Sequence, residues 1–114
     1  MADKLRLICD STDLKDGGIG VRFETPFAGE NNQAFAVRFE GKVHGYLNRC
    51  AHVPIELDWM EGEFFDNTGL YFICSTHGAT YAAETGLCVS GPCVGKSLRK
   101  LSMEERDGKV YLME

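Results

Sequence analysis

Two short segments of the chain each pair a thiolate donor with an imidazole donor. The first holds Cys50 and His52 with one residue between them, and the second holds Cys74 and His77 with two residues between them. Thiolates are ligands of iron–sulfur clusters and of zinc, and neutral imidazole binds both iron and zinc. Each pair is short enough to reach a single metal centre from one loop, so the four residues indicate a metal site.

The two pairs and the residues that follow them form an ordered series of motifs: C-x-H, then C-x-x-H-G, then T-G, and finally G-P. In this order they resemble the Rieske iron–sulfur family, over roughly residues 45–96. The resemblance implies one [2Fe–2S] cluster per chain, in which two histidines replace two cysteines on one of the irons. It places Cys50 and Cys74 on the inner iron and His52 and His77 on the outer iron.

Zinc is the rival metal, because two cysteines and two histidines are also a common zinc set. Zinc fingers typically place two cysteines close together and then two histidines, whereas each close pair here is mixed. Mixed pairs suit two different irons better than one zinc. The 53–73 connection is longer than in many members of the family, and its Trp59, Met60 and Phe64 either form part of a docking face or, as we favour, pack in the core.

Hydrogen bonds to sulfur, charge and solvent exposure tune the reduction potential of such a centre. By the same resemblance, Tyr81 donates to a ligand sulfur, although an ordinary core aromatic is the alternative. Ala79 stands where relatives of high potential have a serine donor. Ile55 and Thr76 stand where those relatives have two disulfide-forming cysteines. We therefore expect a low to intermediate potential.

The cluster is expected to be covered by backbone that approaches it closely. Glycine at position 78 permits such an approach because it has no Cβ, and Pro92 fixes a cover loop because its φ is locked; ordinary turns are the alternative for both. Cys88 and Cys93 flank this cover loop. They are packing thiols, a disulfide, or residues with a further metal or redox role, and we favour thiols because disulfides are rare in the cytosol.

Alternating apolar and polar residues separated by turn residues predict an all-β fold. The clearest hairpin spans 33–48, with its turn at Glu40 and Gly41, and it leads directly to the first ligand pair. Pro26 is expected to end a strand, residues 27–32 to form a loop, and His44 to lie on a solvated face. Further strands are expected at 5–9, 21–24, 70–73, 81–83 and 87–90, and a closing hairpin with an Asp-Gly turn is expected at 102–112. A short helix near 57–61 is the one helical candidate.

These elements predict a single domain over residues 1–114. The resemblance implies a Rieske-type antiparallel β-sandwich with a small cluster-binding subdomain inserted at about 45–96. The formal net charge of −5 argues against nucleic acid and anionic membranes as partners. No apolar run is long enough to span a membrane and no signal-peptide pattern occurs at the N-terminus, so we expect a cytoplasmic protein.

The chain shows one redox centre and no other recognisable reaction machinery. It has no G-x-G-x-x-G dinucleotide fingerprint and no second set of two histidines and a carboxylate for an oxygenase iron. We therefore expect an electron-transfer protein and not an enzyme: a ferredoxin that carries one electron between a flavin reductase and an oxygenase or another terminal enzyme. The alternative is a redox sensor or a small regulatory subunit of a nitrite-reductase-like complex.

Overall fold

The computed structural model describes residues 5–27, 30–49, 57, 62–66, 68–74, 78–91 and 94–113. Within these ranges the chain consists of β-strands, turns and one 3₁₀ turn at Ser11–Asp13. The strands are β1 Leu5–Asp10, β2 Val21–Phe27, β3 Glu30–Phe39, β4 Lys42–Leu47, β5 Tyr71–Ile73, β6 Thr80–Ala82, β7 Cys88–Ser90, β8 Lys100–Leu101, β9 Met103–Arg106 and β10 Lys109–Met113.

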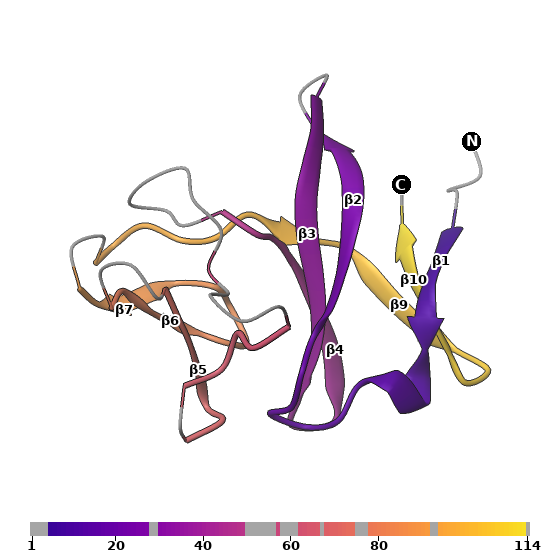
Figure 1. Ribbon diagram of the computed structural model, residues 1–114, viewed down its shortest axis with the longest axis horizontal. Helices are drawn as coiled ribbons and strands as arrows, with labels where there is room; N and C mark the ends of the chain where they lie inside the picture. The colour runs from indigo at the N-terminus through magenta and orange to yellow at the C-terminus, as the bar shows by residue number, and fades with distance from the viewer. Residues whose placement is uncertain are drawn as a thin grey trace.

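The strands form three antiparallel sheets, which confirms the expected all-β fold. The four-stranded sheet has the order β2-β3-β4-β8, and it stands between a sheet of order β1-β10-β9 and a sheet of order β5-β6-β7 (Figure 1). The expected hairpin is β3 and β4, joined at Glu40 and Gly41. The closing hairpin is β9 and β10, and β1 pairs with β10, so both ends of the chain share one sheet.

Alternate residues of β3 pack on opposite faces of the four-stranded sheet. Phe35 and Val37 join the larger core cluster, which the β5-β6-β7 sheet covers, whereas Ala36 joins a smaller cluster with Leu14 and Val110 on the side of β1 and β10. Successive side chains of a strand point to opposite faces, so a central strand with both faces covered is apolar on both. The four-stranded sheet therefore supports both neighbouring layers.

Two expectations about β2 and β3 were wrong. Pro26 does not end β2, and β3 begins at Glu30 within the expected loop, so that Pro26 pairs with Asn31 in the hairpin. Proline lacks an N–H, but β2 lies at the edge of its sheet, where a missing donor is tolerated. The hairpin of β2 and β3 therefore extends beyond the rest of the sheet (Figure 1).

His44 was also expected in the wrong environment. It is 8 % exposed and its ring lies against that of Phe39, with 6.4 Å between the ring centroids. Burial lowers the pKa of His44, and the neighbouring Lys100 lowers it further. His44 pairs with Val37 across β3 and β4, and the face of the sheet that we took to be solvated is the face that the larger core cluster covers.

Arg38 ties β3 to the β9 strand and to the segment before β2. Its guanidinium binds both carboxylate oxygens of Glu105, at 2.6 and 3.0 Å, and it also donates to the backbone oxygens of Ser11, Leu14 and Gly41. The side chains of Arg38 and Glu105 are 15 % and 32 % exposed. This bidentate pair fixes the position of the β1-β10-β9 sheet against the central sheet.

Candidate metal centre

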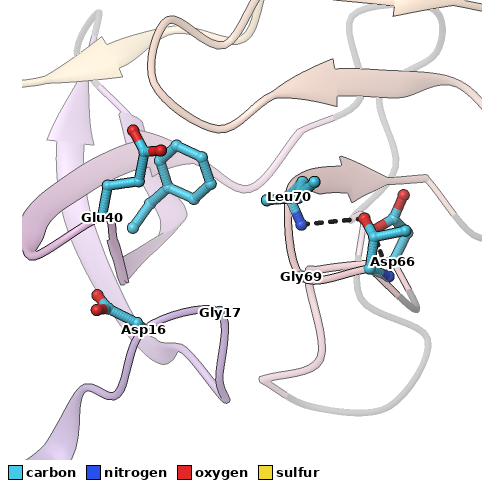
Figure 2. A pocket seen from close by; sticks show the side chains of 8 residues that line it. Asp16, Gly17, Glu40, Asp66, Gly69 and Leu70 are labelled. Atoms are coloured by element: carbon cyan, nitrogen blue, oxygen red, sulfur yellow. Dashed lines mark hydrogen bonds between the residues drawn. The ribbon is translucent and has the colours of Figure 1, made fainter.

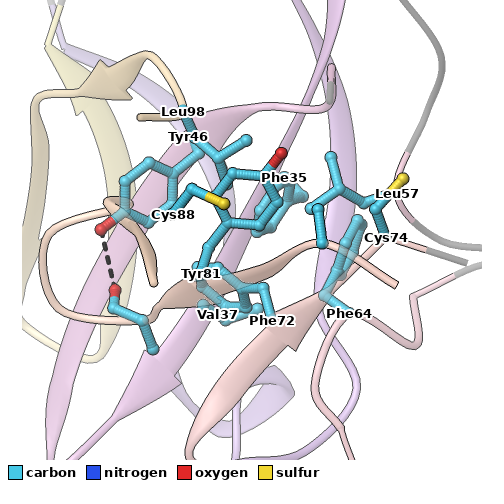
Figure 3. Close-up of a cluster of buried hydrophobic side chains, with 12 residues drawn as sticks. Phe35, Val37, Tyr46, Leu57, Phe64, Phe72, Cys74, Tyr81, Cys88 and Leu98 are labelled. Atoms are coloured by element: carbon cyan, nitrogen blue, oxygen red, sulfur yellow. Dashed lines mark hydrogen bonds between the residues drawn. The ribbon is translucent and has the colours of Figure 1, made fainter. Parts of the chain in front are cut away.

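Cys74 lies at the end of β5, where the predicted strand delivers it. Its side chain is fully buried in the larger core cluster, and its sulfur lies at the edge of that cluster beside Leu57 (Figure 3). The N–H of Cys74 donates to the carbonyl oxygen of Ala79 at 2.8 Å, and the N–H of Gly78 donates to the carbonyl oxygen of Cys74 at 2.9 Å. Cys74 is therefore fixed at the base of a closed turn, in which Gly78 adopts the positive φ of 71° that glycine permits.

The segment that carries the first ligand pair begins at the end of β4. Asn48 is 3 % exposed, and its N–H donates to the carbonyl oxygen of Gln33 on β3. Its side-chain oxygen accepts a 2.8 Å hydrogen bond from the N–H of Leu57. Leu57 is 1 % exposed and belongs to the same core cluster as Cys74. The two ends of the first ligand segment therefore meet beside the second ligand turn.

Gly91 brings the start of the expected cover loop against this second turn. A Cβ atom added to Gly91 would lie 2.8 Å from the Cα of Ala79, closer than a real Cβ atom approaches another carbon. Gly91 also has a φ of 103°, which other residues rarely adopt. Close packing of the backbone is thus the physical reason for a glycine at this position.

Tyr81 and Cys88 lie opposite each other on β6 and β7, the two strands that follow this turn in the chain. Both are buried in the larger core cluster, at 0 % and 1 % exposure. The Cys88 thiol donates to the carbonyl oxygen of Ser90 at 3.2 Å. Phe64, for which a docking role was the alternative, is fully buried and stacks on Phe35 with 3.8 Å between ring centroids, so it is a core residue.

The other expected site residues lie outside the described part of the chain. These are the ligands Cys50, His52 and His77, the cover-loop residues Pro92 and Cys93, and the possible docking residues Trp59 and Met60. The expected short helix near 57–61 lies outside it too, apart from Leu57. Within the described ranges, no group of three His, Cys, Asp or Glu residues could hold a metal ion. Cys74 is the one expected ligand in those ranges.

A hollow of about 450 Å³ lies at the opposite end of β5 and offers different chemistry. Figure 2 shows Asp16 and Glu40 on one side of it and Asp66 and Leu70 on the other. Burial alone would raise the pKa of Asp66. Hydrogen bonds, mainly from the hydroxyl and the N–H of Thr68, outweigh burial, so the pKa of Asp66 is lowered. The residues that line this hollow include no cysteine or histidine, so it is not the metal centre.

Asn48 is the residue of this region that the sequence analysis missed. A signal for it exists, because asparagine side chains in loops often hydrogen-bond to nearby backbone N–H groups. An asparagine at the end of a strand and two residues before a metal ligand is therefore a candidate for closing the ligand loop.

The antiparallel sheets define a small all-β protein with a buried cysteine in a hydrogen-bonded turn. Residues 4–104 match the family model described as the Rieske [2Fe-2S] domain. The chain belongs to this family, whose cofactor is a [2Fe–2S] cluster. The described residues fit that group: the buried Cys74 in its hydrogen-bonded turn could supply a thiolate, and the close contact of Gly91 with Ala79 keeps the backbone near the turn.

Solved structures share this fold. The ferredoxin of carbazole 1,9a-dioxygenase from Nocardioides aromaticivorans IC177 is 20 % identical with a TM-score of 0.71, and 96 % of each chain is covered. The Sphingomonas yanoikuyae B1 ferredoxin is 20 % identical with a TM-score of 0.75, over 97 % of this chain and 99 % of that one.

A longer chain contains the same fold. In the reduced complex between oxygenase and ferredoxin in carbazole 1,9a-dioxygenase, the matched chain is 19 % identical with a TM-score of 0.73. The match covers 95 % of this chain but 27 % of that one, so this chain spans about a quarter of its length. No curated protein sequence matches this chain. Among the described residues, no helix has the length and apolar character needed to cross a membrane.

Proposed function

We propose that this chain is a one-electron carrier that passes electrons from a flavin reductase to a terminal oxygenase or a similar enzyme. The observation that carries the proposal is the buried, hydrogen-bonded turn of Cys74 in a chain of the Rieske family. A [2Fe–2S] cluster supplies reversible one-electron chemistry. The similar ferredoxins of oxygenase systems support the partner class, and the absence of a recognisable second catalytic motif supports a carrier and not an enzyme.

In this proposal Cys50 and Cys74 hold one iron of the cluster, and His52 and His77 hold the other. The β5-β6-β7 sheet keeps the second ligand turn rigid while the cluster is reduced and oxidised. Phe72 and Tyr81 lie in the buried face of this sheet. A rigid support keeps the geometry of a metal site nearly constant. Gly78, Tyr81 and Pro92 lie around the cluster in the same proposal, and the site of action is the cytoplasm.

Substitution of cysteines tests the ligand assignment. Cys74→Ser is expected to abolish the visible absorption and the EPR signal of the dithionite-reduced cluster, because serine does not supply a thiolate. Cys88→Ser is the matched control, since Cys88 is equally buried in the same core cluster but is not an expected ligand. Retention of the cluster in Cys74→Ser, or its loss in Cys88→Ser alone, would contradict the assignment.

Rapid-mixing kinetics tests the carrier role. The holoprotein is mixed first with a reduced flavin reductase of an oxygenase system and then with the oxidised oxygenase, and the cluster absorption is followed in both steps. A carrier is reduced and reoxidised at least as fast as the oxygenase turns over. Slow exchange with every such partner would favour the alternative, a redox sensor or a regulatory subunit of a nitrite-reductase-like complex.

A further inference from the structure

A side-chain hydrogen bond joins the two described residues that flank the first ligand pair. Asn48 and Leu57 flank this segment, and the side-chain oxygen of Asn48 accepts the N–H of Leu57 at 2.8 Å. Both residues are buried, at 3 % and 1 % exposure. Removing the acceptor of a buried N–H lowers the stability of the fold more than removing that of an exposed one, because no water replaces the lost partner. The hydrogen bond therefore holds Asn48 and Leu57 together.

Asn48 and Leu57 are each anchored to a different part of the fold. The N–H of Asn48 donates to Gln33 on β3, which fixes one end to the four-stranded sheet. Leu57 packs in the larger core cluster together with Cys74, which fixes the other end beside the second ligand turn. The Asn48 side chain thus connects the support of the first ligand pair to the support of the second.

We propose that Asn48 is a positioning residue that holds the first ligand segment in the geometry needed to retain the cluster. The inference rests on the proposed ligand roles of Cys50 and His52, which lie between Asn48 and Leu57 in the sequence. The required chemistry is specific: the side chain must present an acceptor oxygen at the length of asparagine. Aspartate keeps an acceptor oxygen at this length but loses the amide N–H donors and buries a charge, alanine has no acceptor, and glutamine places its oxygen one carbon further away.

The test compares Asn48→Ala and Asn48→Asp as holoproteins. Cluster loss is followed by visible absorption in the presence of an iron chelator, and protection of the Leu57 amide by hydrogen exchange with mass spectrometry. In Asn48→Ala we expect cluster loss to be about tenfold faster and the protection of Leu57 to be lost. Asn48→Asp keeps the acceptor, so the amide of Leu57 should stay more protected, and the EPR g-values of the reduced cluster should be less altered, than in Asn48→Ala.

Val110→Ala is the control for a general loss of stability. Val110 is fully buried in the smaller core cluster, on the other face of the four-stranded sheet, so its truncation weakens the fold without touching Asn48. It should speed cluster loss and Leu57 exchange less than Asn48→Ala does. Equal effects of Val110→Ala and Asn48→Ala would overturn the inference, as would full protection of the Leu57 amide in Asn48→Ala.

A second variant covers the case in which Asn48→Ala does not fold. Asn48→Gln keeps the amide and the polarity but not the length, and it should also lose the cluster faster than the parent. A cluster retained as well as in the parent would overturn the inference. None of these measurements uses a redox partner, so they test the inference even if the carrier role fails. Failure of the ligand assignment of the first pair is recognised separately, because Cys50→Ser would then keep the cluster.

Discussion

The hydroxyl of Tyr46 on β4 donates a 2.8 Å hydrogen bond to the carbonyl oxygen of Ala83, which follows β6 (Figure 3). Both residues are buried, so the bond links the central sheet to the β5-β6-β7 sheet away from solvent. Burial raises the pKa of Tyr46, which therefore remains a donor. A ring contact reinforces the link, since Tyr46 and Phe72 pack edge to face at 5.5 Å.

Removing this hydroxyl should destabilise the fold. Tyr46→Phe leaves the carbonyl of Ala83 without its donor, and the free energy of unfolding is expected to fall by about 1 kcal/mol in urea denaturation. Tyr111→Phe is the control, because Tyr111 is only half buried and no hydrogen bond of its hydroxyl occurs among the described residues. An equal loss in both variants would show that the bond to Ala83 contributes nothing.

Substitution of two glycines separates backbone strain from close packing. Gly91 and Gly95 have similar positive φ values, 103° and 95°, so alanine carries the same conformational strain at both. An alanine Cβ at position 91 meets Ala79, whereas at position 95 it has no atom within 4 Å. Gly91→Ala should therefore destabilise by about 2 kcal/mol more than Gly95→Ala. Cluster retention and thermal unfolding measure the difference, and equal values would refute the packing argument.

Tyr81 gives a prediction for the reduction potential. If its hydroxyl donates to a ligand sulfur, Tyr81→Phe removes a bond that stabilises the reduced cluster. A bond worth about 1 kcal/mol corresponds to a fall of about 40 mV for one electron. Protein-film voltammetry measures the shift, with Tyr111→Phe as the control. An unchanged potential in a correctly folded variant would leave Tyr81 as a core aromatic.

The Arg38–Glu105 pair predicts a dependence of stability on pH. The hydrogen bond from Arg38 holds the pKa of Glu105 below its usual 4.5. A lowered carboxyl pKa means that the contribution is fully present above pH 4.5 and is lost as the pH falls through the folded-state value. Glu105→Gln should lower stability by about 1 kcal/mol at pH 7 and by less in acid.

The exposed pair of Lys109 and Asp10 provides the comparison for this prediction. Its atoms are 3.5 Å apart and both side chains are about half exposed, at 49 % and 60 %. Asp10→Asn should therefore change stability little at any pH, because solvent screens the pair. A urea-unfolding series from pH 3 to 7 measures both variants. A constant effect of Glu105→Gln across that range would contradict the argument.

The sequence was sufficient to predict features that depend on neighbouring residues. Alternation and the Glu40-Gly41 turn predicted the hairpin of β3 and β4, and the apolar run before Cys74 predicted β5. Features that depend on distant contacts were not predictable. The burial of His44 depends on the layer that covers its sheet, and the continuation of β2 through Pro26 depends on the edge position of that strand.

The same distinction between local and distant contacts applies to the candidate site. The motif spacing identified Cys74, and the structure places it in a buried turn. The bond between Asn48 and Leu57 was missed because it joins residues nine positions apart, across a segment whose conformation the spacing does not determine. Periodicity describes which face a residue occupies, but it does not describe which backbone N–H a polar side chain will reach.

The pairing of β1 with β10 has a practical consequence for attaching the protein to a surface. Leu5 and Met113 are register partners in the β1-β10-β9 sheet, on the far side of the central sheet from β5, β6 and β7 (Figure 1). An anchoring tag at either end of the chain would therefore hold the molecule with the Cys74 turn directed away from the support. Because Leu5 and Met113 lie side by side, a short linker could also join the two ends of the chain. Opening the chain at Gly41, in the turn between β3 and β4, would then give a circular permutant.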